Sequence, residues 1–350
     1  MRIENDVKLD FSDVLIRPKR SALNSRKEVE LERTFKFKYS PDTWTTVPII
    51  TANMDTTGTF EMAKALQEFN MATALAKHYS ALQLEEFINS ASRSLLDGVF
   101  VSMGTNPKEL QKLSGSLKYV NKIMIDIANG YSEHFIDCIK RTRDLYPNHI
   151  ICAGNVVTAD MAEALILAGA DIVKCGIGNG SVCTTRIQTG VGYPQLSAVI
   201  ECADAVHGLD GHLMSDGGCN IPADFAKAFG AGADFVMSGS YFSGHDESGG
   251  KRVQNEETGE LFIQYYGMSS NTAQEIHNEG LKDYRSSEGR TVLIPYKGPV
   301  EESCKNLLGG LRSSCTYVGA STIKQLPKRT TFIRVNNTHN RVYESNTIRL

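Results

Sequence analysis

A cysteine on a glycine-rich loop is the first feature of this sequence that could perform chemistry. Cys183 lies within GIGNGSVCTTRIQTGVGYPQ (176–195), a segment with five glycines, and Thr185 follows two residues later. Glycines let backbone groups approach a ligand closely, and a thiol reacts only as an accessible thiolate. The loop predicts nucleophilic catalysis by Cys183, with an ordinary surface thiol as the alternative.

Two shorter glycine motifs are typical of an anion site. Asp216-Gly217-Gly218 and Gly239-Ser240 each end an apolar run. Backbone N–H groups of such turns bind phosphate in many α/β proteins, and Asp216 could accept hydrogen bonds from ribose hydroxyls. The alternative for Asp216 is a simple turn, which Asp-Gly also favours.

A long polar excursion, 241–298, supplies a candidate acid. It is rich in Gly, Ser and Glu, and it carries GMSS (267–270) and YRSSEG (284–289). Segments of this kind above a binding site often act as lids. Glu288 could then act as a general acid or base on closure; a solvated surface glutamate is the alternative.

Eight apolar runs must position these residues. They lie at 47–54, 71–76, 98–104, 122–128, 149–156, 170–177, 212–218 and 233–240. Amphipathic stretches separate or follow them, at 58–69, 83–95, 107–114, 131–145, 159–168, 195–207 and 221–229. This alternation indicates parallel βαβ units. We predict an α/β fold, a (β/α)8 (TIM) barrel whose active site lies at the C-terminal ends of the strands; an open doubly wound sheet is the alternative.

An internal echo supports the barrel. Ala168-Gly169-Ala170-Asp171 and Ala231-Gly232-Ala233-Asp234 precede the sixth and eighth runs. Each copy is typical of one βαβ unit whose helix ends at a glycine.

The rest of the chain is expected to complete one domain over 1–350. We expect an N-terminal segment (1–46) with a hairpin near 11–16, a flap (241–298) with weak strands at 251–254 and 261–266, and closing helices (within 300–324) and a tail in 299–350.

Composition narrows the classes of function. The 350 residues carry a formal charge of −3, which argues against non-specific nucleic-acid binding. Even the apolar stretch Ala162–Ala170 is far too short to span a membrane, and no secretory leader is apparent. The eight cysteines form no CxxC pair, so we expect mostly buried thiols in a reducing cytoplasm.

At these motifs the sequence resembles the inosine-monophosphate dehydrogenase and GMP reductase family. GNGSVCTTR, SDGG, GMSS, YRSSEG and GGLRSSCTYVGA carry the resemblance, which runs from VKLDFSDVLIRPKR (7–20) to KRTTFIRV (328–335). Asn179 stands where proline is common, and Ser240 where a second glycine is usual. The combination covers almost the whole chain.

The resemblance implies the reaction of the reductive branch of this family. That reaction is the irreversible, NADPH-dependent reductive deamination of GMP to IMP and ammonia, a step of purine nucleotide interconversion and salvage. Cys183 would attack C2 to give a thioimidate, with Thr185 and Glu288 handling the protons. The family resemblance also implies a homotetramer and a bound K⁺ held by carbonyl groups of Gly178, Gly180 and Cys183, with Arg186 adjacent.

The resemblance also assigns the ligand contacts. GMP contacts are expected at Ser181, Asp216, Gly217, Gly218, Gly239, Ser240, Gly267, Met268, Ser269, Arg285, Ser286, Ser287, Glu288 and Gly289. NADPH contacts are expected at Ser25, Arg26, Lys77, Asp126, Ile127, Ala128, Ile177, Gly178, Met268, Tyr284, Arg285, Ser313, Ser314, Cys315 and Thr316. Arg26 or Lys77 would contact the 2′-phosphate.

Two other functions compete with this one. The dehydrogenase branch usually carries paired regulatory domains after the second strand, where 78–98 has room for one helix only. It also needs an Arg-Tyr pair on its flap, and 267–283 contains no arginine. A catalytically dead nucleotide-binding barrel is the second alternative, against which the intact Cys183, Thr185 and Glu288 argue.

Overall fold

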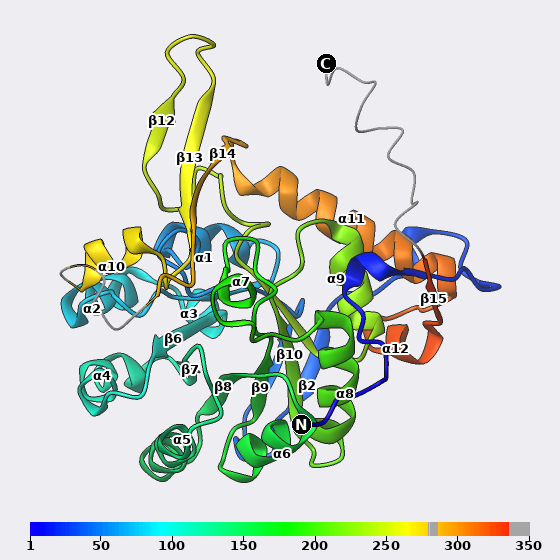
Figure 1. The fold of residues 1–350 in the computed structure, drawn as a ribbon, viewed down its shortest axis with the longest axis horizontal. Helices are drawn as coiled ribbons and strands as arrows, with labels where there is room; N and C mark the ends of the chain where they lie inside the picture. The colour runs from blue at the N-terminus through cyan, green and yellow to red at the C-terminus, as the bar shows by residue number, and fades with distance from the viewer. Residues whose placement is uncertain (279, 281–285, 336–350) are drawn as a thin grey trace.

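Eight parallel strands close into a barrel in the computed structural model, which describes residues 1–278, 280 and 286–335 (Figure 1). The strands are β4 (Ile49–Thr51), β5 (Ala72–Ala74), β6 (Val99–Met103), β7 (Lys122–Asp126), β8 (Ile150–Val156), β9 (Ile172–Cys175), β10 (His212–Asp216) and β11 (Phe235–Ser238). They pair in sequence order, and β11 returns to β4 with Val236 opposite Ile49. The predicted (β/α)8 barrel is confirmed, and the open sheet is excluded.

Helices surround the barrel, and all except α7, which lies in the glycine-rich loop, are at predicted positions. They are α1 (Phe60–Gln67), α2 (Ala81–Ser90), α3 (Arg93–Asp97), α4 (Pro107–Leu113), α5 (Glu133–Leu145), α6 (Ala159–Leu167), α7 (Thr185–Thr189), α8 (Gln195–His207), α9 (Pro222–Gly230) and α11 (Val300–Val318). The stretch expected as one helix at 83–95 is divided, because the Ser92 hydroxyl accepts from the Leu95 N–H and starts α3 afresh. The closing segment also holds 3₁₀ turn η4 (Ile323–Gln325) and α12 (Leu326–Arg329).

A hairpin from the N-terminal segment closes one end of the barrel. It consists of β2 (Arg33–Lys36) and β3 (Thr43–Thr46), and it inserts two aromatic side chains among the inward-facing residues of the strands. The rings of Phe35 and Phe235 stack with centroids 4.2 Å apart, and Trp44 stacks on Phe235 at 5.6 Å. Aromatic packing of this kind fills the barrel interior, so ligands must enter at the opposite end.

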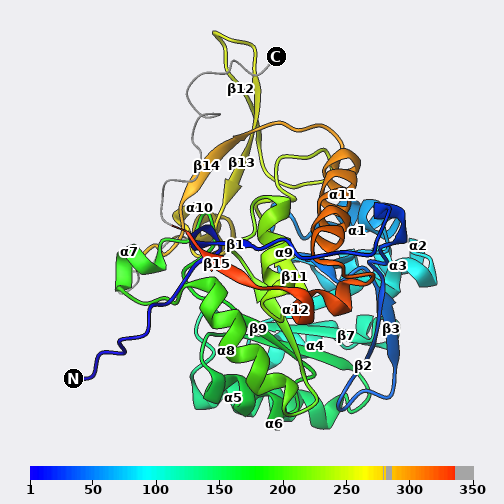
Figure 2. The same ribbon diagram turned by 90° about the vertical axis from the view of Figure 1, so that its right-hand side faces the viewer.

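The hairpin predicted near 11–16 is wrong. Residues Phe11–Asp13 form the 3₁₀ turn η1, and β1 (Val14–Ile16) pairs antiparallel with β15 (Phe332–Arg334). Figure 2 shows this two-stranded ribbon beside α9 and α12. The pairing joins the two ends of the described chain, a contact of long sequence separation that no local pattern could announce. The predicted tail beyond residue 335 lies outside the described residues.

The two copies of the Ala-Gly-Ala-Asp echo perform the same structural task. Asp171 and Asp234 are both buried, directly before β9 and β11. A carboxylate oxygen of Asp171 accepts from the N–H of Ile151 in β8, and one of Asp234 accepts from the N–H of Leu213 in β10, each at 3.0 Å. Arg143 pairs with Asp171 at 2.6 Å, and Arg33 pairs with Asp234 at 2.7 Å. Each aspartate therefore fastens the start of its strand to the preceding strand.

The polar excursion forms a small sheet over the open end of the barrel (Figure 1). Its strands are β12 (Arg252–Gln254), β13 (Leu261–Tyr266) and β14 (Thr291–Pro295), and α10 (Asn271–His277) follows β13. The two weak strand patterns are confirmed. The sequence analysis missed β14, whose residues alternate between exposed and half-buried, and the short helix α10.

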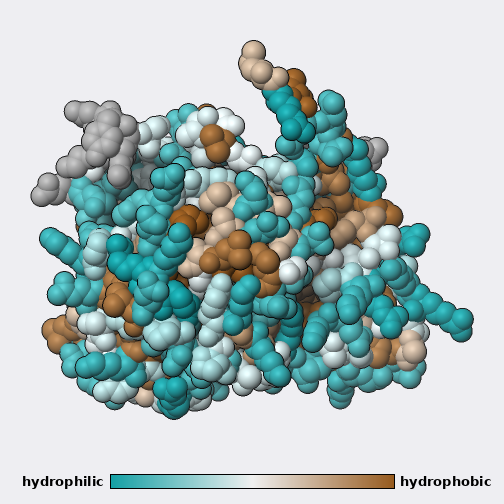
Figure 3. All heavy atoms as spheres, turned by 90° about the horizontal axis from the view of Figure 1, so that it is seen from below, coloured by the Kyte–Doolittle hydropathy of each residue, from teal (hydrophilic) through white to brown (hydrophobic). Residues whose placement is uncertain are grey.

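The outer surface is largely hydrophilic on the side drawn in Figure 3, with hydrophobic side chains gathered near its centre. In the described part of the chain, every helix falls short of the length and apolar character that a membrane span requires.

Candidate active site

A cavity of about 560 Å³ opens at the C-terminal ends of the barrel strands. Its wall is made by the ends of the strands, the loop after β9 and the flap. The lining residues are Ala52, Asn53, Met54, Lys77, His78, Asp126, Ile127, Ala128, Asn155, Lys174, Gly176, Ile177, Gly178, Asn179, Gly180, Ser181, Val182, Cys183, Thr185, Asp216, Gly217, Gly218, Ser238, Gly239, Ser240, Tyr265, Gly267, Met268, Ser269, Ala273, Gln274, His277, Asn278 and Glu288. A pocket at this end of a barrel is the usual place for a substrate.

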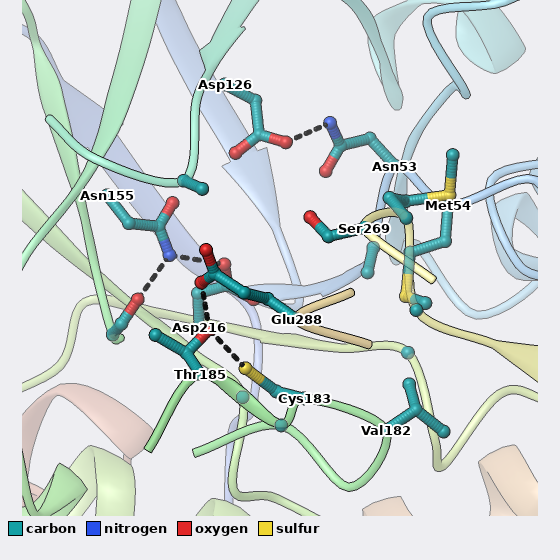
Figure 4. A pocket seen from close by; sticks show the side chains of 18 of the residues that line it. Asn53, Met54, Asp126, Asn155, Val182, Cys183, Thr185, Asp216, Ser269 and Glu288 are labelled. Carbon is teal, nitrogen blue, oxygen red and sulfur yellow. Dashed lines mark hydrogen bonds between the residues drawn. The ribbon is translucent and has the colours of Figure 1, made fainter. Parts of the chain in front are cut away.

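The three predicted catalytic side chains form one series of hydrogen bonds in this cavity (Figure 4). The Cys183 thiol donates to Thr185 Oγ1 at 3.2 Å. The Thr185 hydroxyl donates to Glu288 Oε2 at 2.8 Å. A proton leaving the thiol can therefore pass through one hydroxyl to a carboxylate, which is the arrangement that nucleophile activation requires.

Cys183 differs from the other cysteines in its surroundings. It is partly exposed, whereas the other seven are buried, and all eight are unpaired. Burial raises the pKa of the Cys304 thiol to about 12 and that of Cys315 to about 11, so these thiols stay protonated near neutral pH. Accessibility therefore singles out Cys183.

The flap holds Glu288 against the cysteine loop through backbone hydrogen bonds. The N–H of Thr184 donates to the carbonyl of Glu288 at 2.9 Å, and the N–H of Arg290 donates to the carbonyl of Val182 at 3.0 Å. The Arg290 guanidinium also donates to the carbonyl of Ser181 at 2.8 Å. The carboxylate thus reaches the cavity from a segment about one hundred residues distant in sequence.

A buried lysine lies beneath two of the predicted ligand-binding carboxylates. Lys174 Nζ is 2.7 Å from Asp126 Oδ1 and 2.6 Å from Asp216 Oδ2, and its side chain is 3% exposed. Burial opposes the charged ammonium, but the two carboxylates outweigh it and raise the pKa of Lys174 well above its usual value. Burial likewise opposes ionisation of Asp126, and Lys174 outweighs it, so the pKa of Asp126 is lowered. Lys174 and Asp126 therefore both carry their charges at neutral pH.

Two asparagine side chains also donate hydrogen bonds to these carboxylates. The Asn155 amide donates to Asp216 Oδ2 at 2.8 Å, and the Asn53 amide donates to Asp126 Oδ2 at 2.9 Å (Figure 4). The Oδ1 atom of Asn155 is buried and has no partner among the described residues. It is a buried acceptor to which no described residue donates a hydrogen bond.

The predicted anion cradle is made largely of backbone. Gly217 and Gly218 have φ of +88° and +78°, values that favour glycine, and a Cβ on Gly217 would come within 2.9 Å of Asn179 Oδ1. At Gly239 a Cβ would lie 2.7 Å from the Tyr265 hydroxyl. The hydroxyl of Ser240, where the family usually has glycine, donates to Asn220 Oδ1 at 2.6 Å and so turns toward that side chain.

The remaining predicted substrate residues divide into two groups. Gly267, Met268 and Ser269 line the cavity with Ser181. Ser286, Ser287 and Gly289 lie beside it rather than in its wall: the Ser286 hydroxyl donates to Gln188 Oε1 at 3.1 Å, and Gly289 forms an isolated bridge with Cys183. Tyr284 and Arg285 lie outside the described residues.

The residues predicted to contact the cofactor lie in two separate regions of the structure. Lys77, Asp126, Ile127, Ala128, Ile177, Gly178 and Met268 line the same cavity as the substrate residues. Ser25 and Arg26 belong to the 3₁₀ turn η2 (Arg26–Glu28) and its N-cap, and 313–316 lie in α11, against which η2 packs. None of this second group lines the cavity of its own chain.

The loop predicted to hold a cation is firmly anchored. Arg186 pairs with Asp10 at 3.1 Å and donates to the carbonyl of Tyr193 at 2.6 Å, and its side chain packs against Gly178. The carbonyl of Gly180 accepts from the Cys183 N–H at 3.0 Å. A carbonyl oxygen accepts twice, so a lone pair of Gly180 remains for a cation.

Sequence reasoning assigned no role to several groups of the cavity. Lys174 left a signal, a lone charge inside the apolar run ADIVKCGI. Asn53 and Asn155 stand at predicted strand ends, where polar side chains belong to the site. Tyr265 left no such signal, because it comes from the flap strand β13.

Known proteins resemble this chain over nearly its whole length. A family model described as "IMP dehydrogenase / GMP reductase domain" matches residues 8–347. A GMP reductase from Citrobacter koseri is 59% identical over 348 residues, which is 99% of this chain and 100% of that protein. GMP reductases from Shigella boydii and Escherichia coli K12 are each 58% identical over the same shares. With its closed barrel and its thiol on the loop after β9, the chain belongs to the IMP dehydrogenase / GMP reductase family of oxidoreductases, whose members use a nicotinamide cofactor.

Proposed function

We propose that this enzyme converts GMP into IMP and ammonia with NADPH. The Cys183–Thr185–Glu288 hydrogen-bond chain carries the proposal, because it supplies both a nucleophile and a route for its proton. The high identity to proteins named GMP reductase supports the substrate.

The residues perform the first half of the reaction as follows. The Cys183 thiol gives its proton through Thr185 to Glu288, and the sulfur forms a bond to C2 of the guanine ring. The same two groups return a proton to the exocyclic amine, and the C2–N bond breaks to release ammonia. This leaves a thioimidate between Cys183 and the purine, since a thiolate is a good nucleophile and a tolerable leaving group.

A reduced nicotinamide supplies the hydride that C2 needs after ammonia has left. The residues present fit such a group, because seven of the predicted cofactor contacts, Lys77 and Met268 among them, line the same cavity as Cys183. Lys77 could hold the 2′-phosphate that distinguishes NADPH. Hydride addition would make C2 tetrahedral, and the C2–S bond would then break, so that C2 becomes trigonal again, the Cys183 thiolate leaves and IMP is released.

The same proposal includes the quaternary structure and the cation. Ser25, Arg26 and 313–316 do not line the cavity, so a second copy of the chain would have to bring them to it. We therefore propose a homotetramer, and K⁺ on the carbonyls of Gly178, Gly180 and Cys183. The unpaired thiols support a reducing compartment such as the cytoplasm.

Incubation with GMP and NADPH tests the function directly. We expect stoichiometric loss of reduced nicotinamide and formation of IMP and ammonia, and Cys183→Ala should abolish turnover while GMP still binds. Cys138→Ala, at a buried cysteine on α5, is the matched control. The competing dehydrogenase function predicts that IMP and an oxidised nicotinamide yield XMP. Steady XMP formation at a rate comparable to GMP reduction would overturn the proposal.

A further inference from the structure

Two histidines and an aspartate lie close together at the rim of the cavity, and none of them belongs to the Cys183–Thr185–Glu288 series of hydrogen bonds. Asp55 follows β4, His78 follows β5, and His277 is the last residue of α10 in the flap. One ligand atom from each lies within 4.8 Å of the other two. The barrel and the flap therefore contribute ligands to the same small volume.

The contacts among these side chains are close and directional. His277 Nε2 is 2.5 Å from Asp55 Oδ2. The rings of His78 and His277 are nearly parallel, with centroids 3.5 Å apart. Within the described part of the chain, no hydrogen bond to either ring nitrogen of His78 is found, so its lone pair is available.

A fourth residue orients the carboxylate. The Tyr266 hydroxyl donates to Asp55 Oδ2 at 3.1 Å. Metal-binding carboxylates and imidazoles are commonly fixed by such outer hydrogen bonds. Neither Asp55 nor Tyr266 takes part in the hydrogen bonds that link Cys183, Thr185 and Glu288, so the proposed mechanism assigns this cluster no role.

We propose that Asp55, His78 and His277 bind a divalent metal ion of the zinc class, which joins the flap to the barrel rim. Two imidazole nitrogens and one carboxylate oxygen are a common zinc ligand set, with water in the fourth position. The nitrogen ligands disfavour Mg²⁺, which selects oxygen. With bonds of about 2.0 Å, the ion takes the place of the proton between His277 and Asp55, and the His78 ring turns to direct its lone pair.

The position of the ion gives it a regulatory consequence. His78 and His277 both line the cavity, and His277 ends the helix that follows β13. Zinc at this point ties α10 to the loops after β4 and β5. It therefore restrains the flap, and bound zinc should inhibit turnover.

The test measures binding separately from turnover. The full chain without a histidine tag is prepared as Cys183→Ala, which removes the accessible thiolate as a rival zinc ligand. Calorimetry should show one Zn²⁺ per chain, and Co²⁺ should give the intense visible absorption of a four-coordinate site. His78→Ala and His277→Ala should each weaken binding at least about 10-fold, and Tyr266→Phe about 10-fold. Mg²⁺ should not compete.

The matched control is His134→Ala, which removes an exposed histidine near the start of α5 and should bind zinc like its parent. Circular dichroism and melting temperature establish that each variant is folded. Absence of stoichiometric zinc in the parent, or binding by both histidine variants equal to that of the parent, would overturn the proposal. Because every arm lacks Cys183, the outcome is independent of whether the enzyme reduces GMP.

Discussion

At the scale of single residues, the proton path from Cys183 ends on a side chain that the flap supplies. Glu288 accepts from Thr185, and its own carbonyl accepts from the N–H of Thr184, so backbone and side chain are both fixed. A carboxylate held in this way can take the thiol proton and return it to the leaving amine. The role belongs to the deamination half of the proposed reaction.

Glu288→Gln should therefore affect the two half-reactions unequally. Loss of the acid should slow ammonia release by about 10²–10⁴-fold, and it should slow hydride exchange between IMP and NADP much less. Single-turnover rates of the two half-reactions provide the measurement. Glu275→Gln, at an exposed glutamate of α10, controls for changes to the flap surface. Equal losses in both half-reactions would contradict the assignment.

Lys174 illustrates how one residue can organise several others. Its ammonium holds Asp126, predicted to face the cofactor, and Asp216, predicted to face the ribose. A lysine with 3% of its side chain exposed is costly unless it is paired. We interpret it as a positioning residue that sets the separation of two carboxylates, because it is held beneath them.

At the scale of elements, the buried aspartates of the sequence echo stabilise the barrel. Asp234 is 3% exposed and receives hydrogen bonds from Leu213 N–H and His207 Nε2 besides its pair with Arg33. Burial opposes its charge, but the hydrogen bond with His207, the His212 ring 3.5 Å away and the nearby Arg33 outweigh burial and lower the pKa of Asp234 well below its usual range. The carboxylate is thus more acidic in the folded chain than in the unfolded chain.

Asp234→Asn should destabilise the protein by about 1–3 kcal/mol at neutral pH, because it leaves the half-buried Arg33 without its charge partner. Since the folded pKa is lowered, the contribution of Asp234 is complete above the unfolded pKa and declines as pH falls below that value. Asp234 raises the pKa of His207 through their hydrogen bond, so protonation of His207 should first enlarge the difference between wild type and variant as pH falls from 7 to about 5. Protonation of Asp234 should then shrink the difference below about pH 4. Urea denaturation near pH 7, about pH 5 and about pH 2.5 measures it.

Asp144→Asn, at an exposed residue of α5, is the matched control and should change stability by less than about 0.5 kcal/mol. A difference for Asp234→Asn that stays constant from neutral to acid pH would contradict the electrostatic explanation.

At the scale of the whole molecule, the two groups of cofactor residues give the proposed oligomer a specific test. Arg26 and 313–316 are separated from the cavity in one chain. If a second copy supplies them, a chain with Cys183→Ala and a chain with Arg26→Glu should complement each other. Mixed assemblies should then restore about one quarter of the sites.

The measurement is NADPH-dependent activity after refolding a one-to-one mixture of the two variants. A mixture of Cys183→Ala with Glu288→Gln serves as the control, since both residues line one cavity and cannot complement. Activity no greater than the mean of the separate variants would argue against a shared site. Light scattering of the wild type gives the number of chains.

The sequence by itself determined the barrel and the identity of its chemical groups. Eight apolar runs predict buried parallel strands because strands covered on both faces cannot tolerate alternation. The loop at 176–195 and the SDGG motif can also be located from the sequence, because glycine and polar residues gather where buried strands end. These signals are local, so a single sequence is enough to locate them.

Only the tertiary structure decided which of these groups meet. Several contacts join residues that lie far apart in the chain. They are the pairing of β1 with β15, the packing of Phe35 and Trp44 inside the barrel, the ion pairs of Lys174 with Asp126 and Asp216, and the stacking of His78 on His277. Such contacts depend on how the closed barrel brings its strand ends to one rim and on where the flap packs. Local periodicity carries no information about that packing, which is why Lys174 and Asn155 became visible as partners of Asp216 only in the folded molecule.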